Sequence, residues 1–355
     1  MRSLTAALLM LCAGPAMAQT IAAPQVLDTA VNAVIRPAMI SFKARASDLE
    51  AAMDELCTSP SATALTTATE RFGAAATAYG QVEFLRIGPL MEDNRSDRLL
   101  FWPDRKGIAL RQVQAILADD DVAATDLTTL RGKSVAVQGF GALEFVLYGT
   151  DSETLVTADG AFRCSFGQAI AANINQIAGE LEAGWLKDDG IASHLIDPQP
   201  SYADYRTDIE ALEALVGLVS HGIEATRDSR INPFVAKGTT AAKPKQALFW
   251  RSDLTLPMIR ANIEGMRLLI EQSGVARDVT EKDKSLDGSI AFEFSNALRA
   301  IDLVTLPVEQ AVTDEKQAHA LSYLVLVTSS LQSLVGDQLS AALGLSVGFS
   351  SLDGD

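Results

Sequence analysis

The chain has 355 residues and a formal net charge of −16, with 29 basic side chains against 45 acidic ones. An acidic balance of this size argues against binding to nucleic acids or to anionic lipid surfaces, which attract basic proteins. The length exceeds that of one comfortable hydrophobic core, so two domains of ordinary size are expected.

The first 18 residues are typical of a cleavable secretory signal. Arg2 gives a charged start, residues 4–11 form a short apolar run, and residues 14–18 end in a small-x-small cleavage site. Lipid anchoring is the less favoured alternative, because Cys12 follows two large residues and lies inside the apolar run. We therefore expect a periplasmic protein whose mature chain has 28 basic and 45 acidic side chains, a net charge of −17.

Two cysteines, Cys57 and Cys164, remain after export. A pair of cysteines in an oxidising compartment usually forms a disulfide. The alternative is a pair of buried free thiols. We predict the disulfide, which would stabilise the protein by joining its N-terminal helices to a later helix.

Apolar residues recur at helical spacing along the mature chain, and strand-like alternation is almost absent. This pattern predicts an all-α fold of two antiparallel helical bundles. The apolar stretch 321–335 is interrupted by Ser and Gln, so we interpret it as a core helix rather than a membrane span. The positions with the clearest helical spacing are Val26, Val31, Val34, Ile35, Met39, Leu212, Leu215, Val216, Val219, Met258, Ile259, Ile263, Met266 and Leu269.

A Gly- and Pro-containing segment, residues 188–202, separates the two predicted bundles and is interpreted as a linker. The predicted organisation is a signal peptide at 1–18, an N-terminal helical bundle at 19–200 and a C-terminal helical bundle at 201–355. Each half is long enough to form a core of its own.

Three short motifs occur twice in the same order, which indicates an ancient internal duplication. Two related halves commonly pack about a pseudo-twofold axis with a cleft between them, and we expect the functional site in that cleft. The repeated motifs are Arg86-Ile-Gly-Pro and Arg230-Ile-Asn-Pro at an offset of 144, Leu-Phe-Trp102 and Leu-Phe-Trp250 at an offset of 148, and GxxAxEF at 139–145 and 288–294 at an offset of 149.

Dense polar residues follow the two X-Pro sequences, in the loops 90–106 and 235–253. The first loop holds three arginines around Trp102, and the second holds three lysines and Arg251 around Trp250. Because guanidinium groups bind carboxylates bidentately, these loops predict a pocket for an anionic or metal-chelating ligand. The alternative is pairing of the arginines with nearby carboxylates, which would lock the two repeats together.

Histidine and glutamate occur with metal-binding spacing at His221 and Glu224, on a predicted helix. One such pair supplies too few ligands for a firm metal site, and the repeat has Thr77 at the position of His221. We therefore interpret the pair as part of a solvated helix face. The sequence shows no phosphate-binding glycine loop, serine elbow or catalytic cysteine arrangement.

Residues 79–107, which include Phe-Trp102-Pro-Asp104, together with residues 139–149 and 251–265, carry motifs of a known family. Together they resemble the imelysin family of exported bacterial proteins, and the resemblance spans nearly the whole mature chain. It implies an all-helical, two-domain protein of the periplasm or outer surface. It also implies links to iron regulation or uptake and to a proposed metallopeptidase activity.

The hallmark of that family is GxHxxE, and this chain has Gly141 at the position of the histidine. His and Glu three residues apart share a helix face and can jointly hold a metal ion, whereas glycine offers no ligand. Glu144 remains as a candidate metal ligand. The missing histidine argues against a working metallopeptidase, so a non-enzymatic role is favoured.

We expect an exported imelysin-like protein that binds a ligand between its halves, and the resemblance points to iron, another divalent metal or an anionic iron chelate. One alternative is a metal-dependent peptidase or hydrolase with altered ligands. Another is an interaction module for a periplasmic or membrane-associated partner protein. The predicted ligand-binding residues are Arg86, Arg98, Trp102, Asp104, Glu144, Arg251 and Glu293.

Overall fold

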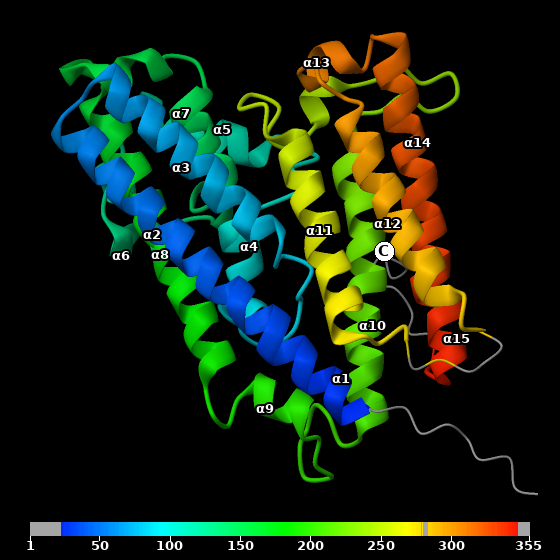
Figure 1. The fold of residues 1–355 in the computed structure, drawn as a ribbon. Coiled ribbons are helices and arrows are strands. Elements are labelled where there is room, and N and C mark those ends of the chain that lie inside the picture. The colour runs from blue at the N-terminus through cyan, green and yellow to red at the C-terminus, as the bar shows by residue number, and fades with distance from the viewer. Residues whose placement is uncertain (1–22, 278, 280–282, 347–355) are drawn as a thin grey trace, which may run out of the picture.

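The computed structural model describes residues 23–277, 279 and 283–346, and the predicted signal peptide lies outside this part of the chain. The described residues form helices joined by loops, and none of them belongs to a β-strand beyond one isolated bridge. Two groups of long helices lie side by side (Figure 1). The predicted all-α fold is confirmed, whereas the internal duplication stays a prediction.

The first group is built around α2 (Arg36–Thr58), which packs against α3 (Ala62–Gly80) and α8 (Ala161–Leu186). Phe42 and Leu49 lie two helical turns apart on α2, so one face of the helix is apolar and fully buried. The shorter helices of this half are η2 (Gly88–Leu90), η3 (Glu92–Asn94), α4 (Arg95–Leu99), α5 (Ile108–Ala118), η4 (Val122–Ala124), α6 (Leu127–Arg131), η5 (Val135–Val137), α7 (Phe140–Tyr148), η6 (Ser152–Val156), η7 (Ala158–Gly160) and α9 (Ile191–Ile196).

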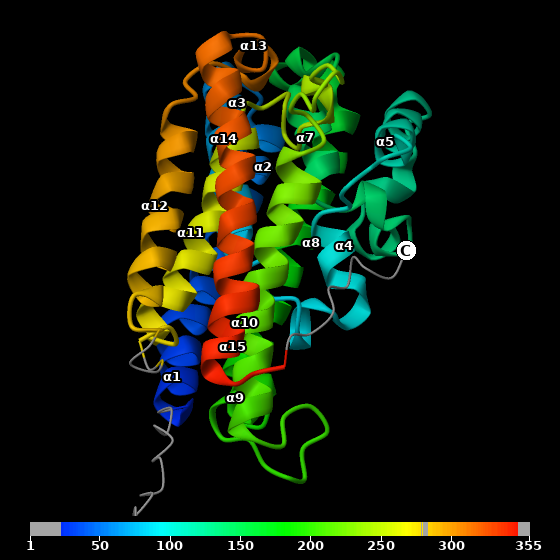
Figure 2. The same cartoon turned by 90° about the vertical axis from the view of Figure 1, so that its right-hand side faces the viewer.

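The second group contains α10 (Asp208–Ala225), α11 (Thr255–Ser273), α12 (Leu286–Asp302) and α14 (Glu315–Gln332). Figure 2 shows these four helices running alongside one another, and α12 and α14 pack closely together. The shorter helices of this half are η8 (Thr226–Ile231), η9 (Pro244–Gln246), α13 (Val308–Ala311), η11 (Ser333–Leu339) and α15 (Ser340–Leu343).

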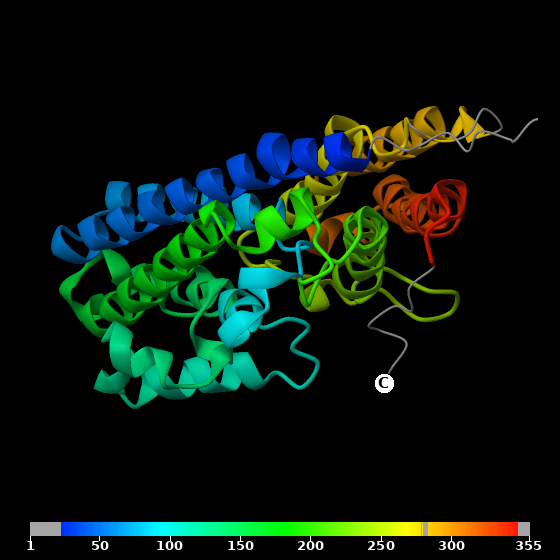
Figure 3. The same cartoon turned by 90° about the horizontal axis from the view of Figure 1, so that it is seen from below.

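One long helix belongs to both groups. The segments α1 (Ala23–Thr29), η1 (Ala30–Ile35) and α2 follow one another without a break, because the residues that join them keep right-handed helical backbone angles. The segments α1 and η1 pack against α10 and α11 of the second half, whereas α2 packs within the first half. Seen from below, the helix runs along both groups (Figure 3). The buried side chains of both halves form one continuous hydrophobic cluster, and a domain boundary at residue 200 stays a prediction.

The continuous helix Glu315–Leu343, which comprises α14, η11 and α15, is the one described helix long and apolar enough to cross a membrane by length and composition alone. In the fold, Leu324, Val327 and Leu331 are buried at helical spacing. They face α10 and α12, against which the helix packs. This packing is that of a core helix in a folded domain, in agreement with the interpretation of the sequence.

The disulfide between Cys57 and Cys164 is confirmed, with Cα atoms 5.5 Å apart. It joins the end of α2 to the beginning of α8. The predicted linker is less irregular than the sequence suggested, because it contains α9. Within it, His194 Nδ1 lies 2.9 Å from a carboxylate oxygen of Asp204, and the imidazole stacks on Tyr202.

Candidate functional site

A cavity of about 530 Å³ lies between the two halves. One wall comes from residues in the segment 100–113 and from α7, and the other comes from residues in the segments 228–233 and 245–251. Its volume lies within the roughly 300–1,000 Å³ of typical small-molecule sites. Four of the predicted ligand-binding residues line it: Trp102, Asp104, Glu144 and Arg251.

Glu144 connects the two walls. Its Oε1 atom accepts hydrogen bonds from the backbone N–H groups of Arg251 and Ser252, both at 3.2 Å, and from the Ser252 hydroxyl at 2.9 Å. The other oxygen, Oε2, lies 4.0 Å from the Arg251 guanidinium, at the limit of an ion pair. Burial raises the pKa of the Glu144 carboxyl, although the Ser252 hydrogen bond and the Arg251 charge oppose the shift.

The loop that faces Glu144 has a strained backbone. Phe249 and Asp253 adopt left-handed angles, with φ of 59° and 56°, which non-glycine residues rarely do. The tripeptide between them supplies all three donors to Glu144. Beyond the loop, Thr255 Oγ1 donates a hydrogen bond to the Leu248 carbonyl at 2.7 Å, which holds the two ends of the loop together. Such strain persists where surrounding contacts enforce it, and it is enriched at functional sites.

The first turn of α7 carries two glycines in very different surroundings. A Cβ atom on Gly139 would lie 2.2 Å from the Leu99 carbonyl oxygen and 2.3 Å from the Arg98 carbonyl oxygen, so packing requires glycine there. A Cβ atom on Gly141 would meet nothing within 4 Å, and this exposed residue lines the cavity. A histidine side chain would have room at this position, next to Glu144 on the same helix face.

Three cationic side chains line the cavity: Arg105, Lys245 and Arg251. The Arg251 guanidinium carbon lies 4.5 Å from the centroid of the Trp250 ring, and Lys245 Nζ lies 5.1 Å from it. Within the described residues, none of the three donates a side-chain hydrogen bond, and Arg105 and Lys245 have no carboxylate within ion-pair distance. The charges of Arg105 and Lys245 therefore remain available to a ligand, whereas the Arg251 guanidinium lies at the limit of an ion pair with Glu144.

The carboxylates of the cavity, in contrast, are engaged within the protein. Both oxygens of Asp104 accept hydrogen bonds from backbone N–H groups at the beginning of α5, at 2.7 and 2.9 Å. Asp228 accepts hydrogen bonds from Arg227 and Asn232. The hydrogen bond from Arg227 lowers the pKa of Asp228, with burial acting in the opposite direction. With Glu144 Oε1 bonded to the opposite loop, the one contact among the described residues between an acid and a cation of the cavity is the 4.0 Å approach of Glu144 Oε2 to Arg251.

Trp102 also joins the two halves. Its indole N–H donates a hydrogen bond to the backbone carbonyl of Ser229 at 2.8 Å. This hydrogen bond fixes the ring in the cavity wall. It satisfies the indole N–H, and the two faces of the ring can still pack against other groups. Ser229 lies in the π-helical segment η8, which follows α10 and directs its residues towards the cavity.

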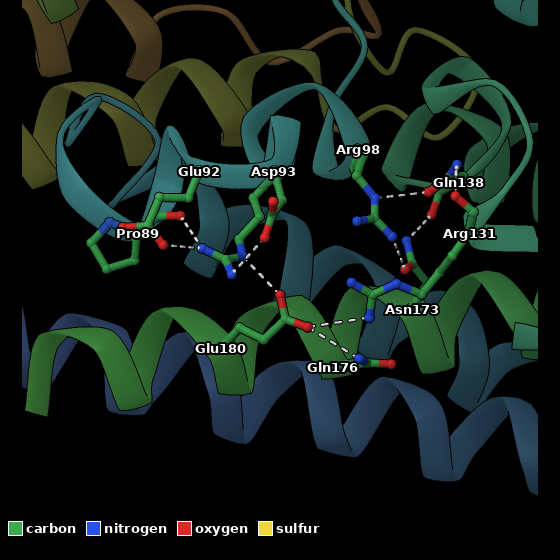
Figure 4. Close-up of polar contacts among 10 residues, drawn as sticks. Pro89, Glu92, Asp93, Arg98, Arg131, Gln138, Asn173, Gln176 and Glu180 are labelled. Atoms are coloured by element: carbon green, nitrogen blue, oxygen red, sulfur yellow. Dashed lines mark hydrogen bonds and ion pairs between the residues drawn. The ribbon is translucent and has the colours of Figure 1, made fainter. Parts of the chain in front are cut away.

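Arg98 lies outside the cavity. Its buried guanidinium donates hydrogen bonds to the side-chain oxygens of Gln138, at 3.0 Å, and Asn173, at 3.4 Å, as Figure 4 shows. Burial lowers its pKa, and the nearby charge of Arg131 acts in the same direction. Arg131 itself pairs with Glu180 on α8 at 3.2 Å. The structure thus places Arg98 in an internal network of the first half.

Arg86 and Glu293, two further predicted ligand-binding residues, also lie outside the cavity lining. The Arg86 guanidinium donates to the hydroxyl of Ser96 at 2.9 Å. Glu293 accepts hydrogen bonds from Ser330 on α14, at 2.7 Å, and from Asn296. These three contacts are structural, so the structure brings together only four of the seven predicted residues.

The described residues contain no group of three His, Cys, Asp or Glu side chains arranged to hold a metal ion. Metal binding at Glu144 therefore stays a prediction without a complete donor set. The interpretation of His221 and Glu224 as a solvated face is wrong for Glu224, which is only 9% exposed. The carboxylate lies inside the bundle because α10 turns this face towards its neighbours.

Among the residues absent from the predicted ligand-binding set, three contribute charge or hydrogen bonds to the site: Arg105 and Lys245 in the cavity lining, and Ser252, which follows the lining residue Arg251. Arg105 and Lys245 lie in the two polar loops, and the sequence signal for both was a basic residue three to five positions from a tryptophan. Ser252 had a weaker signal, as the neighbour of Arg251 in a family-like motif. Its contact with Glu144 joins residues 108 positions apart and depends on the tertiary fold.

Comparison with known proteins agrees with the fold. A crystal structure of an imelysin-like protein from Psychrobacter arcticum is similar, with a TM-score of 0.77 at 17% identity over 93% of this chain and 99% of that one. A "putative iron-regulated protein A precursor" from Parabacteroides distasonis is also similar, with a TM-score of 0.67 at 16% identity over 88% of this chain and 95% of that one. Among curated proteins, none matches this sequence. The Imelysin family model matches residues 36–335, and the chain therefore belongs to the imelysin family.

Proposed function

We propose that this protein is an exported binding protein for an anionic iron chelate, which it holds in the cavity between its two halves. The proposal rests on one observation: the cations and the carboxylates of the cavity differ in how far they are paired within the protein. Arg105 and Lys245 have no carboxylate partner among the described residues, and Arg251 lies only at the limit of an ion pair with Glu144, whereas three carboxylates are hydrogen-bonded within the protein. A ligand that brings negative charge would complete these interactions.

The mature chain is strongly acidic, and this makes the cationic cavity distinctive. An acidic surface repels anions at long range, but this repulsion is screened by salt beyond about 8–10 Å. Inside the cavity, Arg251 and Lys245 are held against the face of Trp250. Cation–aromatic contacts of this kind fix the cations in place and reduce the ordering cost of binding.

Iron enters the proposal through the family resemblance and through the description of one structural neighbour as an iron-regulated protein precursor. A bare metal ion is a weaker candidate for this cavity, because the described residues offer no complete set of ligands. A chelate brings its own ligands and presents anionic groups to the protein. The cationic wall suits such a complex better than a free cation.

Export to the periplasm is part of the proposal. It is supported by the signal-like first 18 residues and by the disulfide between Cys57 and Cys164, which oxidising compartments allow. The hydrolase and interaction-module alternatives have no such support from the cavity. Gly141 gives no metal ligand, and the two walls carry no unengaged carboxylate to act as a base.

Isothermal titration of the mature protein with ferric citrate, citrate and ferrous ion tests the proposal. We expect ferric citrate to bind more tightly than ferrous ion. Arg251→Gln and Lys245→Gln should each weaken it about tenfold or more, because each removes a charge-assisted contact of about 1.5–3 kcal/mol. The matched control is Lys316→Gln, which removes an exposed lysine of α14 outside the cavity and should change nothing.

Two results would refute the proposed function. The first is that ferric citrate and citrate both fail to bind the parent protein. The second is that they bind equally to the parent and to both cavity variants. In either case the unpaired cations would have no role in ligand binding.

A further inference from the structure

We propose that the ligand of this cavity carries a flat aromatic ring next to its anionic group, and that Gly141 determines this specificity. The inference rests on the proposed function, because it identifies the part of the ligand that adjoins the group held by the cations. It concerns the wall formed by α7, where the cavity meets bare backbone.

Packing gives no reason for a glycine at position 141. The neighbouring Gly139 is required, because any Cβ atom there would overlap the carbonyl oxygens at the end of α4. At Gly141 a Cβ atom would meet nothing within 4 Å. Glycine in a helix is less favourable than alanine, so its presence without a packing role suggests a use for the space. That space belongs to the cavity.

The surroundings of this space suit a flat group. Gly141 lies one helical turn before Glu144 and Phe145, and the Arg251 guanidinium carbon lies 5.5 Å from the centroid of the Phe145 ring. Trp102, on the same wall, and Trp250, on the facing wall, contribute their indoles to the cavity lining. A ring placed over the bare backbone of Gly141 would therefore lie among aromatic faces, with Arg251 within reach of its anionic substituent.

These features define a chemical class, the aromatic carboxylates. Aromatic rings in proteins pair favourably at centroid separations of about 4.5–7 Å, and a cavity lined by several of them can discriminate flat groups from aliphatic ones. A carboxylate on the ring can form a bidentate contact with a guanidinium. Ring hydroxyl groups next to the carboxylate would add the chelating oxygens that the proposed function requires.

The test compares two probes, 2,3-dihydroxybenzoate and citrate, by isothermal titration of the mature protein. The variants are Gly141→Ala and Gly141→Leu, which fill the open space by one and by four carbon atoms. The matched control is Gly217→Leu on α10, where a Cβ atom also meets nothing within 4 Å and which lies outside the cavity lining. Circular dichroism and thermal unfolding show whether each variant keeps its fold.

We expect the parent and Gly217→Leu to bind 2,3-dihydroxybenzoate equally. Gly141→Leu should weaken this binding at least about tenfold, and Gly141→Ala should have a smaller effect in the same direction. Citrate binding should change about threefold or less in both Gly141 variants, because an aliphatic ligand does not need the flat space.

Unchanged binding of 2,3-dihydroxybenzoate to a folded Gly141→Leu protein would overturn the inference. Binding of citrate without binding of the aromatic probe by the parent would also overturn it and would leave the proposed function intact. If neither probe binds the parent, the inference fails, and the proposed function fails with it when ferric citrate does not bind either.

Discussion

Replacing Glu144 by alanine should release the loop that closes the cavity. Three donors bond to Glu144 Oε1, two backbone N–H groups and the Ser252 hydroxyl, and alanine leaves all three without this acceptor. A buried donor without a partner costs about 1–3 kcal/mol. The Ser252 hydroxyl can turn to the Phe249 carbonyl, 3.2 Å away, and water can replace some of the bonding lost by the partly buried Arg251 and Ser252. We therefore take the low end for each of the two N–H donors, which gives about 2 kcal/mol in total.

Glu144→Gln separates the hydrogen bonds from the charge. Glutamine keeps a carbonyl oxygen to accept the same bonds but carries no charge into the buried site. Burial raises the pKa of the Glu144 carboxyl above its ordinary value of 4.5, so burying its charge has a cost that glutamine avoids. The hydrogen bonds to a neutral amide oxygen are weaker than those to a carboxylate, but the amide avoids the cost of burying a charge. Because these two effects offset one another, we expect Glu144→Gln to change the unfolding free energy by about 1 kcal/mol or less.

The same raised pKa gives the comparison a pH dependence. A carboxyl whose folded-state pKa is raised contributes stability that is fully present below its unfolded value and is lost as the pH rises through the folded value. The parent should therefore gain stability relative to Glu144→Gln as the pH falls through the raised folded-state pKa to the ordinary value of 4.5, with little further gain below it. Taking the difference between the two proteins at each pH removes the effects of other titrating groups.

Urea unfolding followed by tryptophan fluorescence measures these differences, and the signal reports on the cavity because Trp102 and Trp250 line it. Glu70→Ala, which removes an exposed glutamate of α3, is the control and should have little effect. An alanine variant within about 0.5 kcal/mol of the parent, the range of ordinary surface substitutions, would refute the reasoning. So would equal losses for Glu144→Ala and Glu144→Gln.

Three further predictions concern the framework. Replacing Cys57 and Cys164 together by serine should lower the unfolding free energy by about 2–5 kcal/mol, measured in urea without reductant, because the bridge closes a loop over 107 positions. Burial raises the pKa of Glu180, but hydrogen bonds from two arginines outweigh burial and lower the pKa overall. Glu180→Gln should therefore cost stability at pH 7 and much less at pH 3, which lies below the ordinary pKa of 4.5. An equal loss of stability at both pH values would contradict this. Gly139→Ala should destabilise by about 1–3 kcal/mol in thermal unfolding, whereas Gly141→Ala should be neutral or stabilising.

The fold was predictable from the sequence because the spacing of apolar residues within a short segment is enough to indicate a helix. The spacing of residues such as Ile35 and Met39 follows from the helical period alone, and the structure places both at 1% exposure. The disulfide was predictable for a different reason, since cleavage of the predicted signal would leave only two cysteines. Neither inference needs knowledge of how the helices pack.

The site was less predictable, because a charged residue in a polar loop does not reveal which way its side chain turns. Trp102 and Arg251 line the cavity as expected, but Arg98 turns into the first half and bonds to two amide side chains. Glu293 bonds to Ser330 on α14. Each of these contacts joins residues more than 35 positions apart, and no local pattern encodes such a pairing.

The uninterrupted helix from α1 through α2 limits how the two halves that border the cavity can move apart. A clamshell motion would swing one half away from the other, but α1 and η1 are packed on the second half while α2 is packed in the first. Such a motion would have to bend or break this shared helix. We therefore expect the two halves to move as one frame, so that a molecule could enter or leave the cavity without any separation of the halves.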